Sequence, residues 1–274
     1  MRRDQKIKDF RREKPMIPVA SRSTRPAEPD SGLIFGVLPV LEALKAQARR
    51  VEKVIVAEGV REHRLGEIFE TARANSIAVD RIPREKFDRL FEKGVTHQGV
   101  AARTSAAAYA DAASLIDKAG SDALLLLLDG IEDPRNLGAI LRSAEGAGVG
   151  GVFIPERRAV GLNETVAKSS AGAVEHIPVA KVQNMNRLIE ELKSRNIWVV
   201  GASGDAEQNY TDWDWTQPSA LVLGNEGSGL HRLVAEKCDV LVKIPMYGKM
   251  GSLNVSVAAG VILFEAMRQR GKKS

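Results

Sequence analysis

The stretch ALLLLLDGIEDPRNLGAILRSAEGAGVGGVFIP, residues 123–155, decides the fold of this chain. It opens with five consecutive leucines, a continuous apolar run typical of a strand buried on both faces of a sheet. Asp133 can cap a following helix and Pro134 can occupy its first position, and apolar residues then recur at helical spacing from Leu137 to Ala144. GVFIP predicts a second strand. The stretch therefore predicts strand, helix and strand, the repeating unit of a parallel α/β sheet.

The segments that follow continue this alternation. Further strands are predicted at HIPVAKV, IWVVGAS, ALVLG and DVLVKIP, residues 176–182, 197–203, 220–224 and 239–245, and helical patterns separate them. We therefore expect a domain over residues 122–274, an α/β fold with a parallel sheet and helices on both faces. The last helix is apolar nearly all round from Val255 onward, which is typical of a buried helix.

A smaller α/β unit is expected over residues 31–104. The patterns predict a helix over 34–47, a strand over 51–57, helices over 61–75 and 84–94, and a closing strand over 97–104. Residues 105–121 are rich in small side chains and favour a helical or loose linker. Residues 1–30 carry nine Lys/Arg and four prolines with few large apolar groups, which predicts a disordered basic tail.

Composition limits the partners and the chemistry. A net charge of +5 and a pI near 9.3 favour a polyanionic partner, because cationic surfaces release counterions from phosphates. Cys238 is the single cysteine, and the four histidines lack metal-ligand spacing, so neither a disulfide framework nor a metal is predicted. The sequence has no apolar run of membrane-spanning length and no secretory signal pattern, so we expect a cytoplasmic protein without a membrane partner.

Gly146, Gly148 and Gly151 have the G-x-G-x-x-G spacing of a dinucleotide site. Such a site needs the glycines at the turn from a strand into a helix, whereas here they follow the helix. We interpret them as a helix stop and regard a nicotinamide-dependent oxidoreductase as a disfavoured alternative.

Three other segments place polar groups where ligands bind in α/β sheets, beyond the ends of strands. Asn136 and Arg142 lie on the helix after the leucine strand. LVLGNEGSGL, residues 221–230, ends a strand in a glycine-rich loop whose backbone can approach a ligand closely. Ser252 and Asn254 stand at the entrance of the last helix, and capping accounts for only one of these polar residues.

Together these segments carry a resemblance. NLGAILRSAEGAGV, LVLGNEGSGL and IPMYGKMGSLNVSVAAGVILFE resemble, in order and separation, three motifs of the SpoU/TrmH family of RNA ribose 2′-O-methyltransferases. The resemblance covers residues 123–270, and three ordered motifs are far more specific than one. HQGVAA in the leading unit resembles the ribosomal-protein-like (L30e-like) substrate-binding domain of the 23S ribosomal RNA guanosine 2′-O-methyltransferase branch.

The resemblance implies a C-terminal trefoil knot, a homodimer that pairs through the knotted domain, and S-adenosylmethionine as the cofactor. It implies methylation of a ribose 2′-hydroxyl, in this branch on a 23S rRNA guanosine. A tRNA substrate and a non-catalytic RNA-binding or ribosome-assembly factor remain alternatives. Matching the motifs residue by residue gives a catalytic set of Arg142, Asn136, Glu226, Ser252 and Asn254, and a cofactor-binding set of Leu223, Gly224, Ile244, Met246 and Leu253.

Arg142 matches the family's catalytic arginine, although an arginine is a poor base because its guanidinium stays protonated in proteins. It acts either as a base helped by an RNA phosphate or as an electrostatic stabiliser of the forming alkoxide. Asn136 matches its orienting partner. Glu226 would be the more orthodox base on chemical grounds, but the resemblance makes it a supporting residue. We expect RNA to contact the basic tail, the leading unit, Arg157 and Arg158.

Overall fold

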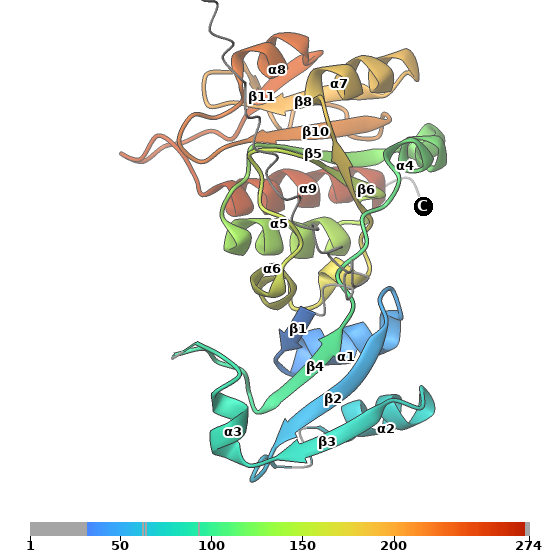
Figure 1. The fold of residues 1–274 in the computed structure, drawn as a ribbon. Helices are drawn as coiled ribbons and strands as arrows, with labels where there is room; N and C mark the ends of the chain where they lie inside the picture. The colour runs from blue at the N-terminus through green and yellow to red at the C-terminus, as the bar shows by residue number, and fades with distance from the viewer. Residues whose placement is uncertain (1–31, 62, 64, 93, 272–274) are drawn as a thin grey trace, which may run out of the picture.

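The computed structural model describes residues 32–61, 63, 65–92 and 94–271 and contains two sheets (Figure 1). The first, near the N-terminus, has four strands, and the second has seven. The predicted tail of residues 1–30 lies outside the described residues. No helix in the described part of the chain is long and apolar enough to cross a membrane.

The four-stranded sheet has the order β1-β4-β2-β3, in which β2 and β3 are parallel and the other pairs antiparallel. Its elements are β1 (Gly32–Phe35), α1 (Val37–Ala46), β2 (Val51–Ala57), α2 (Gly66–Ala74), β3 (Ala78–Ile82), α3 (Arg84–Asp88) and β4 (Val100–Thr104). β2 alternates between two cores: Val54 and Val56 pack with α1 and α2, whereas Ile55 packs with Phe87 of α3 on the other face. Helices therefore cover both faces of this sheet.

Three details of this unit differ from the predictions. Residues 34–35 belong to strand β1 and not to a helix, because Gly36, at φ +99°, turns the chain before α1 begins. Strand β3 was not predicted, since its sequence AVDRI is too polar to read as a buried strand and it lies at the sheet edge. The helix expected over 84–94 ends at Asp88, after which the chain turns.

The HQG part of HQGVAA forms the turn into β4. Gln98 and Gly99 both have left-handed φ, +55° and +75°, and the Gly99 N–H donates to Nδ1 of His97 over 3.1 Å. Gln98 Oε1 accepts from the backbone N–H of Val37 over 2.9 Å. The motif thus has a structural role in this chain, because it joins β4 to the start of α1.

The seven-stranded sheet is parallel throughout, in the order β7-β6-β5-β10-β8-β11-β9. This confirms the predicted parallel α/β architecture. The strands are β5 (Leu124–Asp129), β6 (Gly151–Pro155), β7 (Val179–Val182), β8 (Trp198–Ala202), β9 (Gln208–Asn209), β10 (Ser219–Gly224) and β11 (Val240–Lys243).

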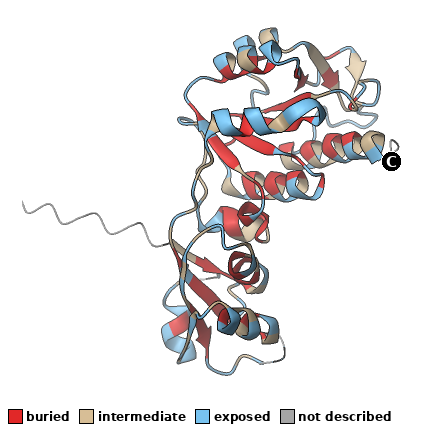
Figure 2. Cartoon of the chain, turned by 90° about the vertical axis from the view of Figure 1, so that its right-hand side faces the viewer, coloured by how far each residue is buried: buried red, intermediate tan, exposed pale blue. Residues whose placement is uncertain are grey.

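β5 shows why its leucines form a continuous run. Leu124, Leu126 and Leu128 belong to the core shared with α5 and α9, and Leu125 and Leu127 to the core shared with α4 and α7. Figure 2 shows buried residues on the strands and on the sides of the helices that face them. The helices of this unit are α4 (Ala112–Ala119), α5 (Pro134–Gly146), α6 (Glu164–Ser169), α7 (Met185–Ser194), α8 (Arg232–Lys237) and α9 (Val255–Gly271), with 3-10 helices η2 (Gly120–Asp122) and η3 (Ala173–Glu175).

The predicted start of α5 is confirmed, and its predicted stop is confirmed at Gly148 only, since Gly146 is the last helical residue and Gly151 begins β6. Asp133 accepts a hydrogen bond from the backbone N–H of Arg135 over 2.7 Å, and Pro134 is the first helical residue. After the helix, Gly148 has a φ of +72°, the left-handed conformation expected of a helix stop.

α9 is less buried than its sequence predicts. One side packs against α5, but Val257, Phe264 and Met267 are exposed on the other. A helix that is apolar all round was expected to be buried all round. In this chain the apolar surface formed by these three side chains is open, so burial within one chain does not explain it.

Candidate active site

The site begins where β10 ends beside β5. Gly224, the last residue of β10, lies opposite Asp129, the last residue of β5. The chain then makes a tight loop and returns, so that a Cβ on Gly224 would lie only 2.1 Å from the carbonyl carbon of Gly229. Glycine is therefore required at residue 224, because only a residue without a side chain allows the two backbones to come this close.

Two side chains tie this loop to the end of β5. Asn225 donates from Nδ2 to the carbonyl oxygen of Gly130 over 2.9 Å, and its Oδ1 accepts from the backbone N–H of Gly227 over 2.9 Å. Asp129, which is buried, accepts through Oδ2 from the backbone N–H of His231 and contacts the imidazole Nδ1, each over 2.9 Å. Both ends of the loop are thus fixed to the neighbouring strand.

A chain of hydrogen bonds joins the three sequence motifs. Asn136, in the first turn of α5, donates from Nδ2 to Oε1 of Glu226 in the loop. Asn254 donates from Nδ2 to Oδ1 of Asn136 over 3.1 Å. Its own Oδ1 accepts from the N–H of Ser256 over 2.9 Å, so Asn254 also caps α9. Three segments far apart in sequence therefore meet through amide and carboxylate groups.

Arg142 is not part of this series of hydrogen bonds. It is an exposed residue of α5, six positions beyond Asn136, and has no side-chain hydrogen bond or ion pair with any residue that the structure describes. An exposed guanidinium on the helix that carries Asn136 is open to an anion from outside the protein.

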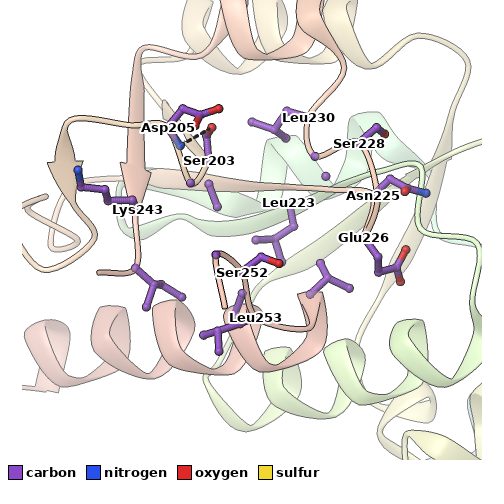
Figure 3. A pocket seen from close by; sticks show the side chains of 18 of the residues that line it. Ser203, Asp205, Leu223, Asn225, Glu226, Ser228, Leu230, Lys243, Ser252 and Leu253 are labelled. Carbon is purple, nitrogen blue, oxygen red and sulfur yellow. Dashed lines mark hydrogen bonds between the residues drawn. The ribbon is translucent and has the colours of Figure 1, made fainter. Parts of the chain in front are cut away.

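A cavity of about 480 Å³ lies next to the loop, among the ends of β8, β10 and β11 and the start of α9 (Figure 3). Leu223 projects into its middle, with Ser203 and Asp205 on one side and Asn225 and Glu226 on the other. All the residues predicted to bind the cofactor line this one cavity: Leu223, Gly224, Ile244, Met246 and Leu253. Of the predicted catalytic residues, Glu226 and Ser252 also line it, whereas Asn136, Asn254 and Arg142 do not.

Some residues of the site were missed in the sequence. Ser203, Gly204 and Asp205 line the cavity directly after β8, and Asp205 adds a second carboxylate to a lining that already contains Glu226. Their signal was a glycine and an acidic residue just after the strand IWVVGAS, where ligands bind in parallel sheets. Asp129 and Asn225 were also missed, since their partners are known only from the fold.

The G-x-G-x-x-G glycines lie at the opposite end of the sheet. Gly151 of the motif pairs with Leu125, near the start of β5, whereas the cavity lies beyond the last residues of the strands. The motif therefore belongs to a helix stop, and a dinucleotide site at these glycines is excluded.

Neither a cysteine nucleophile nor a metal site is supported by the described residues. Burial raises the pKa of the Cys238 thiol to about 12, so Cys238 is a poor nucleophile. Among the described residues, no group of three or more His, Cys, Asp or Glu side chains could hold a metal ion.

Comparisons with known proteins agree with this arrangement. Residues 123–264 match the SpoU rRNA Methylase family, and residues 33–110 match the domain described as RNA 2′-O ribose methyltransferase substrate binding. The first match contains the loop, the cavity and the polar chain, and the second contains the four-stranded sheet.

Relatives and solved structures cover nearly the whole chain. The 23S rRNA (guanosine-2′-O-)-methyltransferase RlmB of Xylella fastidiosa is 48% identical over 86% of this chain and 96% of its own length. A Bacillus subtilis protein provisionally named a TrmH family tRNA/rRNA methyltransferase is 45% identical over 86% of this chain and 95% of its own length.

The SpoU methyltransferase AviRb of Streptomyces viridochromogenes, solved with AdoMet, superposes with a TM-score of 0.74 at 26% identity, over 88% of this chain and 91% of its own. The three motifs meet in space, the family matches span both sheets, and the relatives align over most of their length. The chain therefore belongs to the SpoU rRNA methylase family.

Proposed function

We propose that this chain transfers a methyl group from S-adenosylmethionine to a ribose 2′-hydroxyl of RNA, and that its substrate is a guanosine of 23S rRNA. The observation that carries the proposal is the hydrogen-bonded chain of Glu226, Asn136 and Asn254, which unites the three motifs at the rim of the cavity. The 23S rRNA substrate rests on the RlmB relative, which is named for that activity.

The cavity fits the cofactor on physical grounds. Its volume of about 480 Å³ is within the usual range for small-molecule sites. Leu223, Ile244 and Leu253 offer apolar surface for an aromatic ring, and the loop that begins at Gly224 offers backbone donors and acceptors. Asp205 can accept hydrogen bonds from ribose hydroxyls. When bound, S-adenosylmethionine supplies an electrophilic methyl group on a sulfonium.

The reaction needs alignment and removal of a proton. Transfer would join the 2′-oxygen to the methyl carbon and leave the electron pair of the broken carbon–sulfur bond on sulfur, and the hydroxyl proton would pass to water or to an RNA phosphate. Arg142 is free to bind an RNA phosphate and to stabilise negative charge on the 2′-oxygen. Glu226 already accepts from Asn136, which favours a supporting role for this carboxylate. Asn136 is then the residue that holds the loop and α5 in register.

The path of the chain supports the trefoil knot as part of this proposal. In the sheet, β11 lies between β8 and β9, while the chain runs from β8 to β9 and then back to β10, so this loop surrounds β11. β11 leads from α8, which packs with α7 on one face, to α9, which packs with α5 on the other. Near the end of α9, Arg270 donates from Nε to the carbonyl of Trp215 in the same loop over 2.8 Å.

The exposed side of α9 supports the homodimer as a further part. Val257, Phe264 and Met267 form an open apolar row, and Tyr247 in the preceding loop is 97% exposed. Pairing of two copies through this face would remove the row from water. A Phe264→Glu variant should sediment as a monomer, whereas an unchanged sedimentation coefficient would contradict pairing through α9.

Labelled S-adenosylmethionine tests the reaction. The purified chain is incubated with 23S rRNA transcripts and, separately, with tRNA, and each 2′-O-methylated position is mapped by its resistance to alkaline cleavage. We expect one methylated guanosine in 23S rRNA. Label in tRNA alone would favour the tRNA alternative, and no label in any RNA would favour a non-catalytic RNA-binding factor. The proposal includes a cytoplasmic location, which the 23S rRNA activity in the name of the RlmB relative supports.

A further inference from the structure

The segment between β6 and β7 touches both parts of the molecule. Its helix α6 packs against the start of α5, where the Ser169 hydroxyl donates to the carbonyl of Pro134 over 3.1 Å. A Cβ on Gly138 of α5 would lie 1.9 Å from the Ser169 Oγ, so the two helices are in direct contact. This contact flanks Asn136, and α6 therefore supports the turn of α5 that carries the polar chain.

The other side of the same segment binds the unit of the four-stranded sheet. Arg49 makes a two-pronged contact with Glu175 of η3, from Nη2 to Oε1 over 2.6 Å and from Nε to Oε2 over 2.9 Å. Glu164 of α6 accepts from the backbone N–H of Leu33 over 3.1 Å. These bonds cross from one sheet's unit to the other.

Three further cross-contacts, made by Lys168 and His176, surround the first pair. Lys168 places its ammonium 4.4 Å from the centre of the Phe35 ring and donates to the carbonyl of Thr96. His176 Nε2 lies 2.7 Å from Glu42 Oε2. Each contact involves a charged side chain, so the junction is specified by charge and direction as well as by apolar packing.

Burial makes this junction selective for one arrangement. The side chains of Arg49 and Glu175 are only 6% and 3% exposed. A buried charge that loses its partner is costly, so a different orientation of the two units would leave two unpaired charges out of water. Gly172 tightens the fit, since a Cβ there would lie 2.6 Å from the Cβ of Glu42.

The covalent connection is tied down as well. Ser105, just after β4, exchanges hydrogen bonds with the backbone of Arg50 over 2.9 and 3.1 Å. Tyr109 accepts from the N–H of Leu162 over 2.9 Å, and the N–H of Ala110 donates to Val179 over 2.8 Å. Only residues 106–108 lie between these anchors. The first part of the predicted linker, residues 105–111, is therefore extended and held at both ends, whereas most of its remainder forms the helix α4 (Ala112–Ala119), so the linker is not a loose tether.

We propose that α6 and η3 act as a spacer that fixes the unit of the four-stranded sheet relative to α5, and that Lys168, Glu164 and the Arg49–Glu175 pair are positioning residues that determine which nucleotide is methylated. The inference rests on the proposed function, with a folded RNA that contacts both units at once. A fixed separation between the two contact surfaces allows only one ribose of that RNA to reach Asn136 and Arg142.

The test loosens the spacer at partly exposed positions and leaves the buried pair intact. The variant is Glu164→Ala with Lys168→Ala, and its matched control is Glu190→Ala with Lys237→Ala, an exposed ion pair on α7 and α8. Methylated positions on the 23S rRNA transcript, kcat, KM, cofactor affinity and melting temperature are measured for both. Lys168→Arg is added because an arginine keeps the cation over the Phe35 ring.

We expect the variant to lose at least about tenfold in kcat/KM and to methylate nucleotides neighbouring the wild-type position. Misalignment of reactants by about 1 Å costs up to about a hundredfold. The cofactor affinity and melting temperature of the double variant should stay close to wild type. The Lys168→Arg variant should still methylate the single wild-type position, and the control should behave as wild type. A purely structural role would not spread the methylated positions.

A folded variant that methylates the same single nucleotide with unchanged kcat/KM would overturn the inference. If the double variant unfolds, the single Lys168→Gln variant carries the same two expectations. A wild-type chain that methylates no RNA would instead refute the proposed function, so the two failures are distinguishable.

Discussion

The junction between the two units and the candidate active site use polar groups in opposite ways. At the junction, Arg49 and Glu175 are buried and bind each other at two points. At the site, Glu226, Asn254 and Arg142 are exposed, and Arg142 binds no other described side chain. The junction satisfies its charges internally, whereas the site leaves its cation available.

This difference separates two tasks. A buried, paired charge has nothing to offer a ligand, but it penalises every arrangement except one. An exposed, unpaired arginine adds little to the fold and can bind a phosphate from RNA. Substitutions of the buried pair at the junction should therefore act on stability, those of the more exposed Glu164 and Lys168 should act on alignment, and substitutions at the site should act on catalysis with the fold intact.

Gly224→Ala should have the largest effect, because the site depends on one close approach of backbone to backbone. The new Cβ would lie 2.1 Å from the carbonyl carbon of Gly229, so the loop must move. We expect the loss of detectable cofactor binding and methylation. Gly227→Ala in the same loop is the control, since its Cβ would meet only Asn225 Oδ1 at 3.6 Å. Calorimetric titration with S-adenosylmethionine checks both, and equal affinity in the two variants would refute the steric argument.

Glu175→Ala tests the junction. Removing one partner of a buried pair costs about 3–5 kcal/mol, because Arg49 is left charged and unpaired. Urea unfolding measures the loss. Replacing both partners, as Arg49→Met with Glu175→Leu, should recover most of the stability, because no buried charge remains. If the single and double variants lose the same stability, the pair does not contribute through its charge.

Arg142→Ala should lower kcat by about 10²–10³, the usual cost of removing one group that stabilises developing charge. The melting temperature and the cofactor affinity should not change, because Arg142 is exposed and lies outside the cavity. Arg135→Ala, an exposed arginine on the same helix, is the control for lost positive charge. Single-turnover methylation separates the two, and equal losses in both variants would reduce Arg142 to a non-specific contact with RNA.

The parallel sheet could be predicted because its signals are local. Five leucines in a row require burial on both faces, and Asp133 with Pro134 marks the start of α5 without knowledge of any distant contact. β3 and the true length of α3 escaped, since β3 is a polar edge strand. The open side of α9 escaped for a related reason: an apolar helix surface that another chain could cover has the same composition as one buried within a single chain.

Only part of the site could be predicted. The residues that match family motifs converge: Asn136, Glu226 and Asn254 form one hydrogen-bonded chain, and all five expected cofactor residues line one cavity. Asp129 and Asn225 escaped, because their roles depend on which strand lies beside β10. The junction escaped altogether, since Arg49 and Glu175 are 126 positions apart and each alone resembles a surface charge.

His97 offers the smallest test, and it acts at the edge of the junction. Burial lowers the pKa of this histidine, with smaller contributions from Arg84 and Lys168, while Asp88 opposes the shift. The unfolded chain then binds a proton that the folded chain does not, so stability falls as the pH drops through about 6.5, the ordinary value for histidine. The N-terminal unit should therefore become less stable in acid, whereas the unit that contains the candidate active site should stay folded.

Between pH 7.5 and about 5.5, the melting temperature of a His97→Asn variant should fall less than that of the wild type. Asparagine keeps an acceptor for the Gly99 N–H and does not titrate. His63→Asn, at an exposed histidine of the same unit, should follow the wild-type curve. Curves that run parallel for all three proteins would place the acid sensitivity elsewhere. If the melting temperature depends less on pH in His97→Asn alone, then His97 makes the folding of the N-terminal unit, at the edge of the junction, sensitive to pH, and the active site plays no part in that effect.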